Sequence, residues 1–178
     1  MTSFIIKDHV NRSQAPSWAP DTNSNCTFCR IINNELPAYK IYEDDEIIVI
    51  LDILPLRRGH TLVIPKIHYA RLSELPADYA AATGKVVSRI AQALTKALNN
   101  TALNVVCNQE YAQVVPHVHY HIIPAPTFGT SSESTKCSKK LSSNQPTMKE
   151  MHHMEFKSRR ELDEDDGEVL VKEIRARL

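Results

Sequence analysis

The sequence predicts an α+β fold built from a five-stranded, mostly antiparallel sheet, one long helix and a short N-terminal helix. Short runs rich in β-branched residues, bounded by turn residues and prolines, indicate the strands. Between residues 79 and 97, apolar side chains recur every three or four positions, which indicates an amphipathic helix. This helix lies between the third and fourth predicted strands, so it connects two parts of one sheet.

The first elements are a short helix and a hairpin. Residues 26–33 form a turn leading into a helix, which ends before Pro37. Strands are predicted at 39–43 and 46–51, because both segments are rich in Ile, Val and Tyr. The acidic turn Asp44–Asp45 joins them, which favours an antiparallel pair.

The remaining elements complete the sheet. Residues 59–65 form a third strand, ended by its last residue, a proline. The long helix opens at Leu75-Pro76, since proline is tolerated in a first turn, and reaches about Leu98. Two further strands are predicted at 102–107 and 117–123.

Composition divides the chain into four segments. Residues 1–24 are a leader rich in Pro, Ser and Ala that we expect to be disordered, and 25–126 form the folded domain. Residues 127–155 are a polar, low-complexity insert. Residues 156–178 are a tail in which apolar periodicity from Glu168 onward predicts a short docking helix. The acidic run before that helix either starts it or is a solvated charged stretch.

Charge and hydropathy limit the class of protein. The chain has 21 Lys and Arg against 21 Asp and Glu, so its net charge is zero and gives no bias toward nucleic acid or an anionic membrane. The sequence contains no apolar run of transmembrane length, and Met1–Val10 lacks the apolar core of a secretory signal. We therefore expect a cytoplasmic or nuclear protein, with no membrane and no nucleic acid among its partners.

The main chemical signal is His117-Val118-His119-Tyr120-His121-Ile122-Ile123. Strand alternation would place the three histidines on one face and the apolar side chains on the other. Three imidazoles titrating near neutrality fit two chemistries, metal binding and nucleophilic catalysis at phosphorus. The spacing alone does not separate them.

The chain resembles the histidine triad (HIT) superfamily, whose signature His-φ-His-φ-His-φ-φ, with φ apolar, is matched at every position. Further matches lie in Cys26-x-Phe28-Cys29, Leu51-Asp52-Ile53-x-Pro55, Gly59-His60-Thr61-Leu62-Val63-Ile64-Pro65-Lys66-x-His68 and Gln113-x-Val115-Pro116. Together they cover about residues 26–126 and are most similar to the Hint branch, the purine nucleoside phosphoramidases. The resemblance implies a HIT-like fold and a homodimer in which each subunit carries its own nucleotide site.

The implied reaction is hydrolysis of an adenosine 5′-monophosphoramidate-like substrate to AMP and an amine, through a nucleotidyl-histidine. By motif position, His119 is the nucleophile, His121 and His60 contact the phosphate and handle protons, and His117 orients the site. No cofactor is required for this chemistry. The resemblance also implies a set of nucleotide-binding residues, which are Asp52 for the ribose, Asn108 beside the phosphate, Phe28, Ile31, Leu36, Ile50 and Ile53 for the purine, and Gln113.

The resemblance adds a possible structural zinc site. Cys26 and Cys29 have zinc-ligand spacing, and His68 and His117 would complete a Cys₂His₂ set. The alternative is a pair of ordinary buried thiols. His117 is therefore ambiguous, since it belongs to the histidine row and to the candidate metal site.

Two other functions remain open at this stage. One is hydrolysis of dinucleoside polyphosphates, and the other is a non-catalytic, zinc-stabilised nucleotide-binding scaffold. Two positions also depart from the branch, since Ala112 stands where glycine is common and Val114 where many members have Ser or Thr. A valine side chain cannot donate a hydrogen bond to the leaving group.

Overall fold

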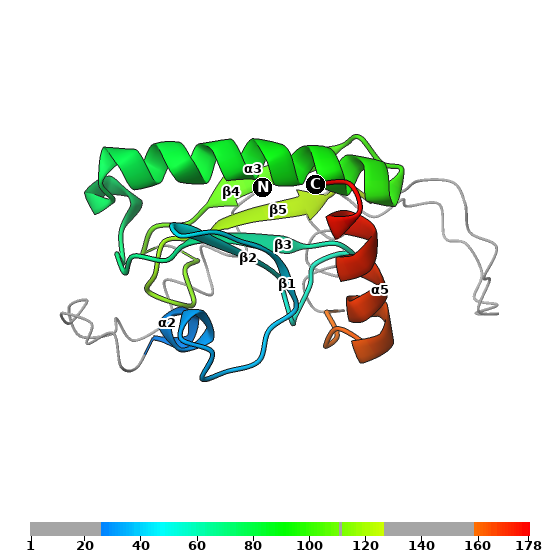
Figure 1. The fold of residues 1–178 in the computed structure, drawn as a ribbon, viewed down its shortest axis with the longest axis horizontal. Helices are drawn as coiled ribbons and strands as arrows, with labels where there is room; N and C mark the ends of the chain where they lie inside the picture. The colour runs from blue at the N-terminus through cyan, green and yellow to red at the C-terminus, as the bar shows by residue number, and fades with distance from the viewer. Residues whose placement is uncertain (1–25, 111, 127–158) are drawn as a thin grey trace, which may run out of the picture.

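The computed structural model describes residues 26–110, 112–126 and 159–178 (Figure 1). The predicted leader (1–24) and the predicted insert (127–155) therefore lie outside the described residues. The elements in chain order are α2 (Thr27–Ile32), β1 (Lys40–Glu43), β2 (Ile47–Leu51), β3 (Thr61–Pro65), the 3₁₀ turn η2 (Leu72–Glu74), α3 (Ala77–Leu98), β4 (Leu103–Cys107), β5 (Tyr120–Pro124) and α5 (Glu164–Arg175).

The predicted α+β fold is confirmed. The five strands form one sheet in the order β1-β2-β3-β5-β4, and every neighbouring pair is antiparallel. The β1–β2 hairpin closes as predicted, because the Asp44 carboxylate accepts hydrogen bonds from the backbone amides of Glu46 and Ile47. Strand β4 lies at one edge of the sheet.

Both faces of the sheet are covered. Figure 1 shows α3 along one face and α2 on the opposite one, with α5 at the end of the sheet near β1. In β2, Ile47, Val49 and Leu51 pack with α3 and α5, whereas Ile48 and Ile50 pack with α2. Burial on both sides explains why β2 is a continuous apolar run rather than an alternating one.

The long helix α3 matches its prediction closely. It contains 22 residues and begins directly after Pro76, with Val86, Ile90, Ala93 and Leu94 buried against the sheet. Asn99 ends it in the left-handed conformation with φ 48°, a geometry that asparagine tolerates better than most residues.

Two predicted boundaries are wrong. The last strand begins at Tyr120 and not at His117, so of the three histidines in the row only His121 lies within β5. The C-terminal helix begins at Glu164, four residues earlier than predicted. The Asp163 carboxylate accepts a hydrogen bond from the Asp166 amide, so the acidic run caps the helix and forms its first turn.

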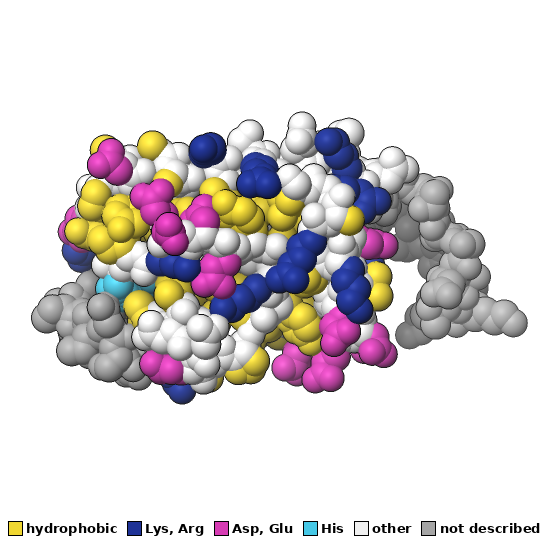
Figure 2. Space-filling model, in the orientation of Figure 1, with side chains coloured by type: hydrophobic (Ala, Val, Ile, Leu, Met, Phe, Trp, Pro, Cys, Tyr) yellow, Lys and Arg dark blue, Asp and Glu magenta, His cyan; other side chains and the backbone are white. Residues whose placement is uncertain are grey.

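Charged residues of both signs alternate over the face of the molecule drawn in Figure 2, and acidic side chains gather at the start of α5. Among the described residues, no helix is both long and apolar enough to cross a membrane.

Candidate active site

The candidate site lies where the chain enters β5, on the face of the sheet covered by α2. His121 is the cross-strand neighbour of Leu62, which packs in the core under α2, whereas Tyr120 is opposite Val63 and packs toward α3. Cross-strand neighbours point to the same face, so His121 points toward α2. The alternation predicted from the sequence therefore holds within the strand, although the strand is shorter.

One ring nitrogen of His119 is hydrogen-bonded to the backbone, and the other can act on a ligand. Its Nδ1 is 2.6 Å from the carbonyl oxygen of His117, so Nδ1 carries the proton and donates it to that oxygen. In the neutral ring, Nε2 then carries the lone pair, as a nucleophile requires. The Phe28 ring lies edge-on to the His119 ring, with a centroid separation of 5.0 Å, and the side chain is only 4% exposed.

His60 and His121 form a second hydrogen-bonded unit. The Leu56 amide donates to His60 Nδ1 at 3.1 Å, so the proton of neutral His60 is on Nε2. His60 Nε2 is 3.0 Å from His121 Nδ1 and donates to it, which leaves the His121 proton on Nε2. Since the His119 and His121 rings are 4.8 Å apart, a proton donor lies beside the predicted nucleophile.

Burial keeps these histidines neutral. The pKa of His60 is lowered to about 4 and that of His121 to about 3, chiefly by desolvation, and the neighbouring His119 and His60 contribute to the lowering at His121. Desolvation also lowers the pKa of His119, although its hydrogen bond to the His117 carbonyl acts in the opposite direction. The imidazoles are therefore neutral at cellular pH, which suits nucleophilic attack.

Asp52 follows β2, as predicted, and lies beside the histidine pair. One carboxylate oxygen accepts the Leu54 amide at 2.8 Å, and the other is 3.4 Å from His60 Nδ1. Its negative charge raises the pKa of His60 against the larger effect of burial. Asp52 can thus stabilise a proton that arrives on His60 Nδ1, in addition to any contact with a ribose.

The apolar residues assigned to a purine slot divide into two groups. Phe28, Ile31 and Ile50 are buried in the core under α2, and Leu36 packs against that core. Ile53 is 57% exposed on the loop after Asp52. A slot between these groups remains a prediction, but the exposed Ile53 has the accessibility that a base-stacking residue needs.

Gln113 holds the loop between β4 and β5 in place through hydrogen bonds to the loop itself and to the segment after β3. Gln113 is buried, where its Oε1 accepts the Glu110 amide at 2.8 Å and its Nε2 donates to the Ala70 carbonyl at 2.8 Å. The predicted nucleotide contact of Gln113 thus remains untested, while its loop-bracing contacts are evident. Asn108 is half-buried just after β4. Ala112 has φ 56°, which explains why glycine would suit this position.

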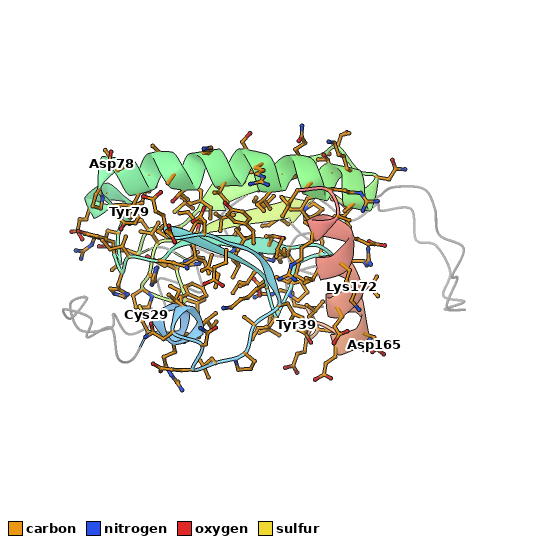
Figure 3. The ribbon with its side chains drawn as sticks, in the orientation of Figure 1. Cys29, Tyr39, Asp78, Tyr79, Asp165 and Lys172 are labelled. Atoms are coloured by element: carbon orange, nitrogen blue, oxygen red, sulfur yellow. The ribbon has the colours of Figure 1, made fainter. Side chains whose placement is uncertain are left out.

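Cys26, Cys29, His68 and His117 come together as the candidate metal set, with their ligand atoms all within 4.8 Å of one another. His117 Nδ1 is 3.4 Å from Cys26 Sγ and 3.6 Å from Cys29 Sγ, and His68 Nδ1 is 3.2 Å from Cys29 Sγ. A tetrahedral zinc with ordinary bond lengths separates sulfur and nitrogen ligands by about 3.6 Å. The four residues therefore fit the ion, and Figure 3 shows Cys29 on α2 below the sheet.

The ring of His117 belongs to this metal set. Its Nε2 donates to the Pro65 carbonyl at 2.7 Å, which orients Nδ1 toward the cysteines, and the side chain is fully buried. Its backbone carbonyl, in contrast, accepts the His119 proton. The two expected roles of His117 thus fall to different atoms. Its ring faces the candidate metal set, and its backbone carbonyl orients the His119 ring.

Arg159 is a charged residue near the site that the sequence-based set does not contain. Arg159 lies in the segment before α5, and its charge acts on His60 and His121, while Asp52 acts on Arg159. No motif marks this arginine, because it is far from the histidine row in sequence.

Comparison with known families identifies the domain. The HIT domain profile matches residues 33–127, which is more than half of the chain. The chain belongs to the HIT family. Solved HIT structures share its fold: a HIT-like protein from Bartonella henselae has a TM-score of 0.65 and 31% identity, covering 88% of this chain and 98% of that one.

Two curated HIT relatives have named activities. Adenylylsulfatase HINT3 from Arabidopsis thaliana is 45% identical over 103 residues, which span 57% of this chain and 52% of that protein. This chain thus matches about half the length of the plant relative. Adenosine 5′-monophosphoramidase HNT1 from Candida albicans is 38% identical over 109 residues, covering 58% of this chain and 72% of that protein.

A third HIT relative bears on the metal set. A zinc-bound histidine triad protein from Mycobacterium smegmatis has a TM-score of 0.62 and 32% identity, covering 86% of this chain and 95% of that one. That relative binds zinc, which is compatible with zinc at the Cys₂His₂ set of this chain.

Proposed function

We propose that the protein is a nucleotide hydrolase that cleaves adenosine 5′-monophosphoramidate-like substrates to AMP and an amine. The observation that carries this proposal is the His119 ring, whose Nδ1 is bonded to the His117 carbonyl so that Nε2 is the reactive nitrogen. The named activities of the plant and yeast relatives support the same chemical class, attack at a nucleotide α-phosphorus.

In the first step, His119 Nε2 attacks the α-phosphorus and forms a nitrogen–phosphorus bond. The bond from phosphorus to the amine breaks as the amine nitrogen takes the proton of His121 Nε2. We infer that anionic substrate brings one extra proton to the His60–His121 pair. This proton binds His60 Nδ1 in place of the Leu56 amide and faces the Asp52 carboxylate, whose oxygen is 3.4 Å from that nitrogen. Donation by His121 then leaves the pair neutral.

In the second step, water attacks the phosphorus of the nucleotidyl-histidine. The bond between phosphorus and His119 Nε2 breaks, AMP forms, and the proton from water returns to His121 Nε2. The His119 imidazolium of the intermediate keeps its Nδ1 proton on the His117 carbonyl throughout. No further co-reactant is needed to balance the reaction.

The test replaces the nucleophile. His119→Ala should lower AMP release from an adenosine phosphoramidate by at least about a thousandfold, since nucleophile removal leaves only residual catalysis. Intact-protein mass spectrometry after brief exposure to substrate should show an AMP adduct on the wild type and none on the variant. Retained AMP binding by the variant shows that its loss of rate is not a loss of fold.

The rival functions give different results in the same experiment. A dinucleoside polyphosphate hydrolase would turn over diadenosine polyphosphates faster than the phosphoramidate in a side-by-side assay. A non-catalytic scaffold would bind AMP but form no adduct. Unchanged AMP release by His119→Ala would refute the mechanism.

We also propose that the Cys₂His₂ set holds a structural zinc ion. Its support is the convergence of the four ligand atoms and the orientation of His117 by the Pro65 carbonyl. Zinc would there act as a crosslink between α2, the segment after β3 and the approach to β5, with no part in proton transfer.

Finally, we propose a homodimer paired through β4. This strand is at the sheet edge, and its residues Asn104 and Val105 are exposed, Val105 by 42%. An exposed edge of this kind readily pairs with a second strand. A second copy related by a two-fold axis would extend the sheet without leaving that edge open.

A further inference from the structure

We propose that Arg159, outside the matched HIT domain, binds the phosphate group of the nucleotide and is a substrate-positioning residue of the site. The inference deepens the proposed function and rests on it. The structural basis is the position of the segment before α5 against the loop that follows Asp52.

A backbone hydrogen bond ties this segment to the site. The Leu162 amide donates to the Ile53 carbonyl at 2.9 Å, one residue after Asp52. Arg159 is three residues before Leu162, so this bond keeps it close to the Asp52 loop. Figure 1 shows the segment turning back from the start of α5 toward the sheet.

Helix α5 anchors the segment from the other side. Leu170 and Ile174 are fully buried against α3 and the sheet. Arg58 pairs with Asp166 through Nη2 at 2.8 Å and Nε at 2.9 Å, which joins the loop before β3 to the first turn of the helix.

A close contact adds to this anchoring. A Cβ on Gly167 would lie 2.9 Å from the Tyr39 ring, so the absence of a side chain lets the helix approach β1 closely. Figure 3 shows Tyr39 beside the lower half of α5. The segment that carries Arg159 is therefore anchored at its C-terminal end, by the Leu162 amide and by the docking of α5.

The charge of Arg159 reaches the reacting groups. It is half-buried, and it lowers the pKa values of both His60 and His121. Burial lowers the pKa of Arg159, and the Asp52 carboxylate acts against that lowering. These interactions agree with the position that the Leu162–Ile53 hydrogen bond gives the segment, beside the loop that follows Asp52.

The negative charge of Asp52 gives a reason for a cation such as Arg159 at this site. The Asp52 carboxylate lies next to the His60–His121 pair, and its negative charge repels a phosphate. A guanidinium offsets that repulsion and presents a donor fork that matches phosphate oxygens. Arg57 also acts on His60, and its guanidinium donates to the Pro124 carbonyl at the end of β5.

The alternative role is an ion pair in which Arg159 only neutralises Asp52. Such a pair would influence the nucleoside part of a ligand, because Asp52 is the expected ribose contact. Phosphate binding would influence only ligands that carry a phosphate. Comparing AMP with adenosine therefore separates the two roles.

The experiment measures the dissociation constants of AMP and adenosine by calorimetry on the full chain. Arg159→Gln should weaken AMP binding about tenfold, which is the typical effect of losing a charge-assisted hydrogen bond. Adenosine binding should stay within about twofold, which also shows that the variant is folded. Arg159→Lys should lose less AMP affinity, because it keeps the charge without the fork.

Arg160→Gln is the matched control, since Arg160 is the exposed neighbouring arginine, and it should leave both constants unchanged. Equal AMP binding by Arg159→Gln and wild type would overturn this inference, and so would parallel losses for AMP and adenosine. If the wild type binds neither ligand and forms no adduct, the proposed function itself fails. A wild type that hydrolyses the phosphoramidate while Arg159→Gln binds AMP normally refutes the role of Arg159 alone.

Discussion

At the scale of single residues, the site depends on which ring nitrogen carries each proton. The His117 carbonyl assigns the His119 proton to Nδ1, and the Leu56 amide assigns the His60 proton to Nε2. From these two contacts the tautomer of His121 follows, because it accepts from His60 at Nδ1. A ring nitrogen with a lone pair on His119 and an N–H donor on His121 thus come to lie on neighbouring rings.

Burial of His60 predicts a stability that falls in acid. Its pKa is about 4 in the folded protein and about 6.5 in an unfolded chain. Between these values the unfolded state binds more protons, so the free energy of unfolding decreases as pH falls from about 6.5 toward 4, by up to about 1.4 kcal/mol for each unit of pKa difference. His121 adds in the same direction.

The measurement is urea unfolding at several pH values between 7.5 and 4.5. His60→Asn keeps an acceptor near the Leu56 amide but does not titrate in this range. Its free energy of unfolding should therefore depend less steeply on pH than that of the wild type. The comparison cancels the effect of acid on the metal set, which both proteins share. Identical slopes would show that His60 does not contribute.

At the scale of elements, the candidate zinc set joins segments that are far apart in sequence. It joins the start of α2 to His68 after β3 and to His117 before β5. Because α2 is only six residues long, its own hydrogen bonds stabilise it weakly. A crosslink at its first turn would also hold Phe28 against His119.

We therefore expect metal removal to destabilise the domain and to impair the site. Cys26→Ser should lose bound zinc and lower the Tm by about 5–10 °C, equivalent to about 2–3 kcal/mol for a chain of this size. Activity should fall as well, since His117 supplies the carbonyl that orients His119. Metal analysis by mass spectrometry and thermal unfolding would check both effects.

The matched control is Cys107→Ser, because Cys107 is a half-buried cysteine in β4 that lies outside the metal set. It should retain stoichiometric zinc. A Tm that is equally low for both variants, or a metal-free wild type, would contradict a structural zinc at this place.

At the scale of the whole molecule, the open side of the sheet is β4. Helix α5 packs beside β1 near the other edge, whereas among the described residues β4 pairs only with β5. The net charge of zero places no strong repulsion between two copies. These features favour association through β4.

The dimer prediction is tested by Val105→Lys. A lysine on the edge strand opposes pairing, so the variant should elute as a monomer in size-exclusion chromatography with light scattering, while the wild type has twice the chain mass of 20.1 kDa. Val169→Lys is the control, because Val169 on α5 is similarly exposed, at 46% against 42%. A monomeric wild type, or dissociation by both variants, would contradict pairing through β4.

The sequence by itself determined the fold class, the long helix and the membership of the histidine row, because these depend on local periodicity and on motifs. The resemblance also named the four residues whose ligand atoms converge in the structure as a candidate metal set, Cys26, Cys29, His68 and His117. The sequence could not predict that the last strand begins at Tyr120, because the hydrogen-bonded pairing with β3 decides where this strand begins.

Only the tertiary structure decided which contacts each histidine makes. The His117 ring faces the cysteines while its carbonyl faces His119, and alternation along a strand cannot separate a ring from its own backbone. The position of Arg159 was equally inaccessible, since it depends on α5 docking and on the bond between Leu162 and Ile53. Contacts between distant segments carry no signature in local sequence, and in this protein they set the protonation and the charge of the site.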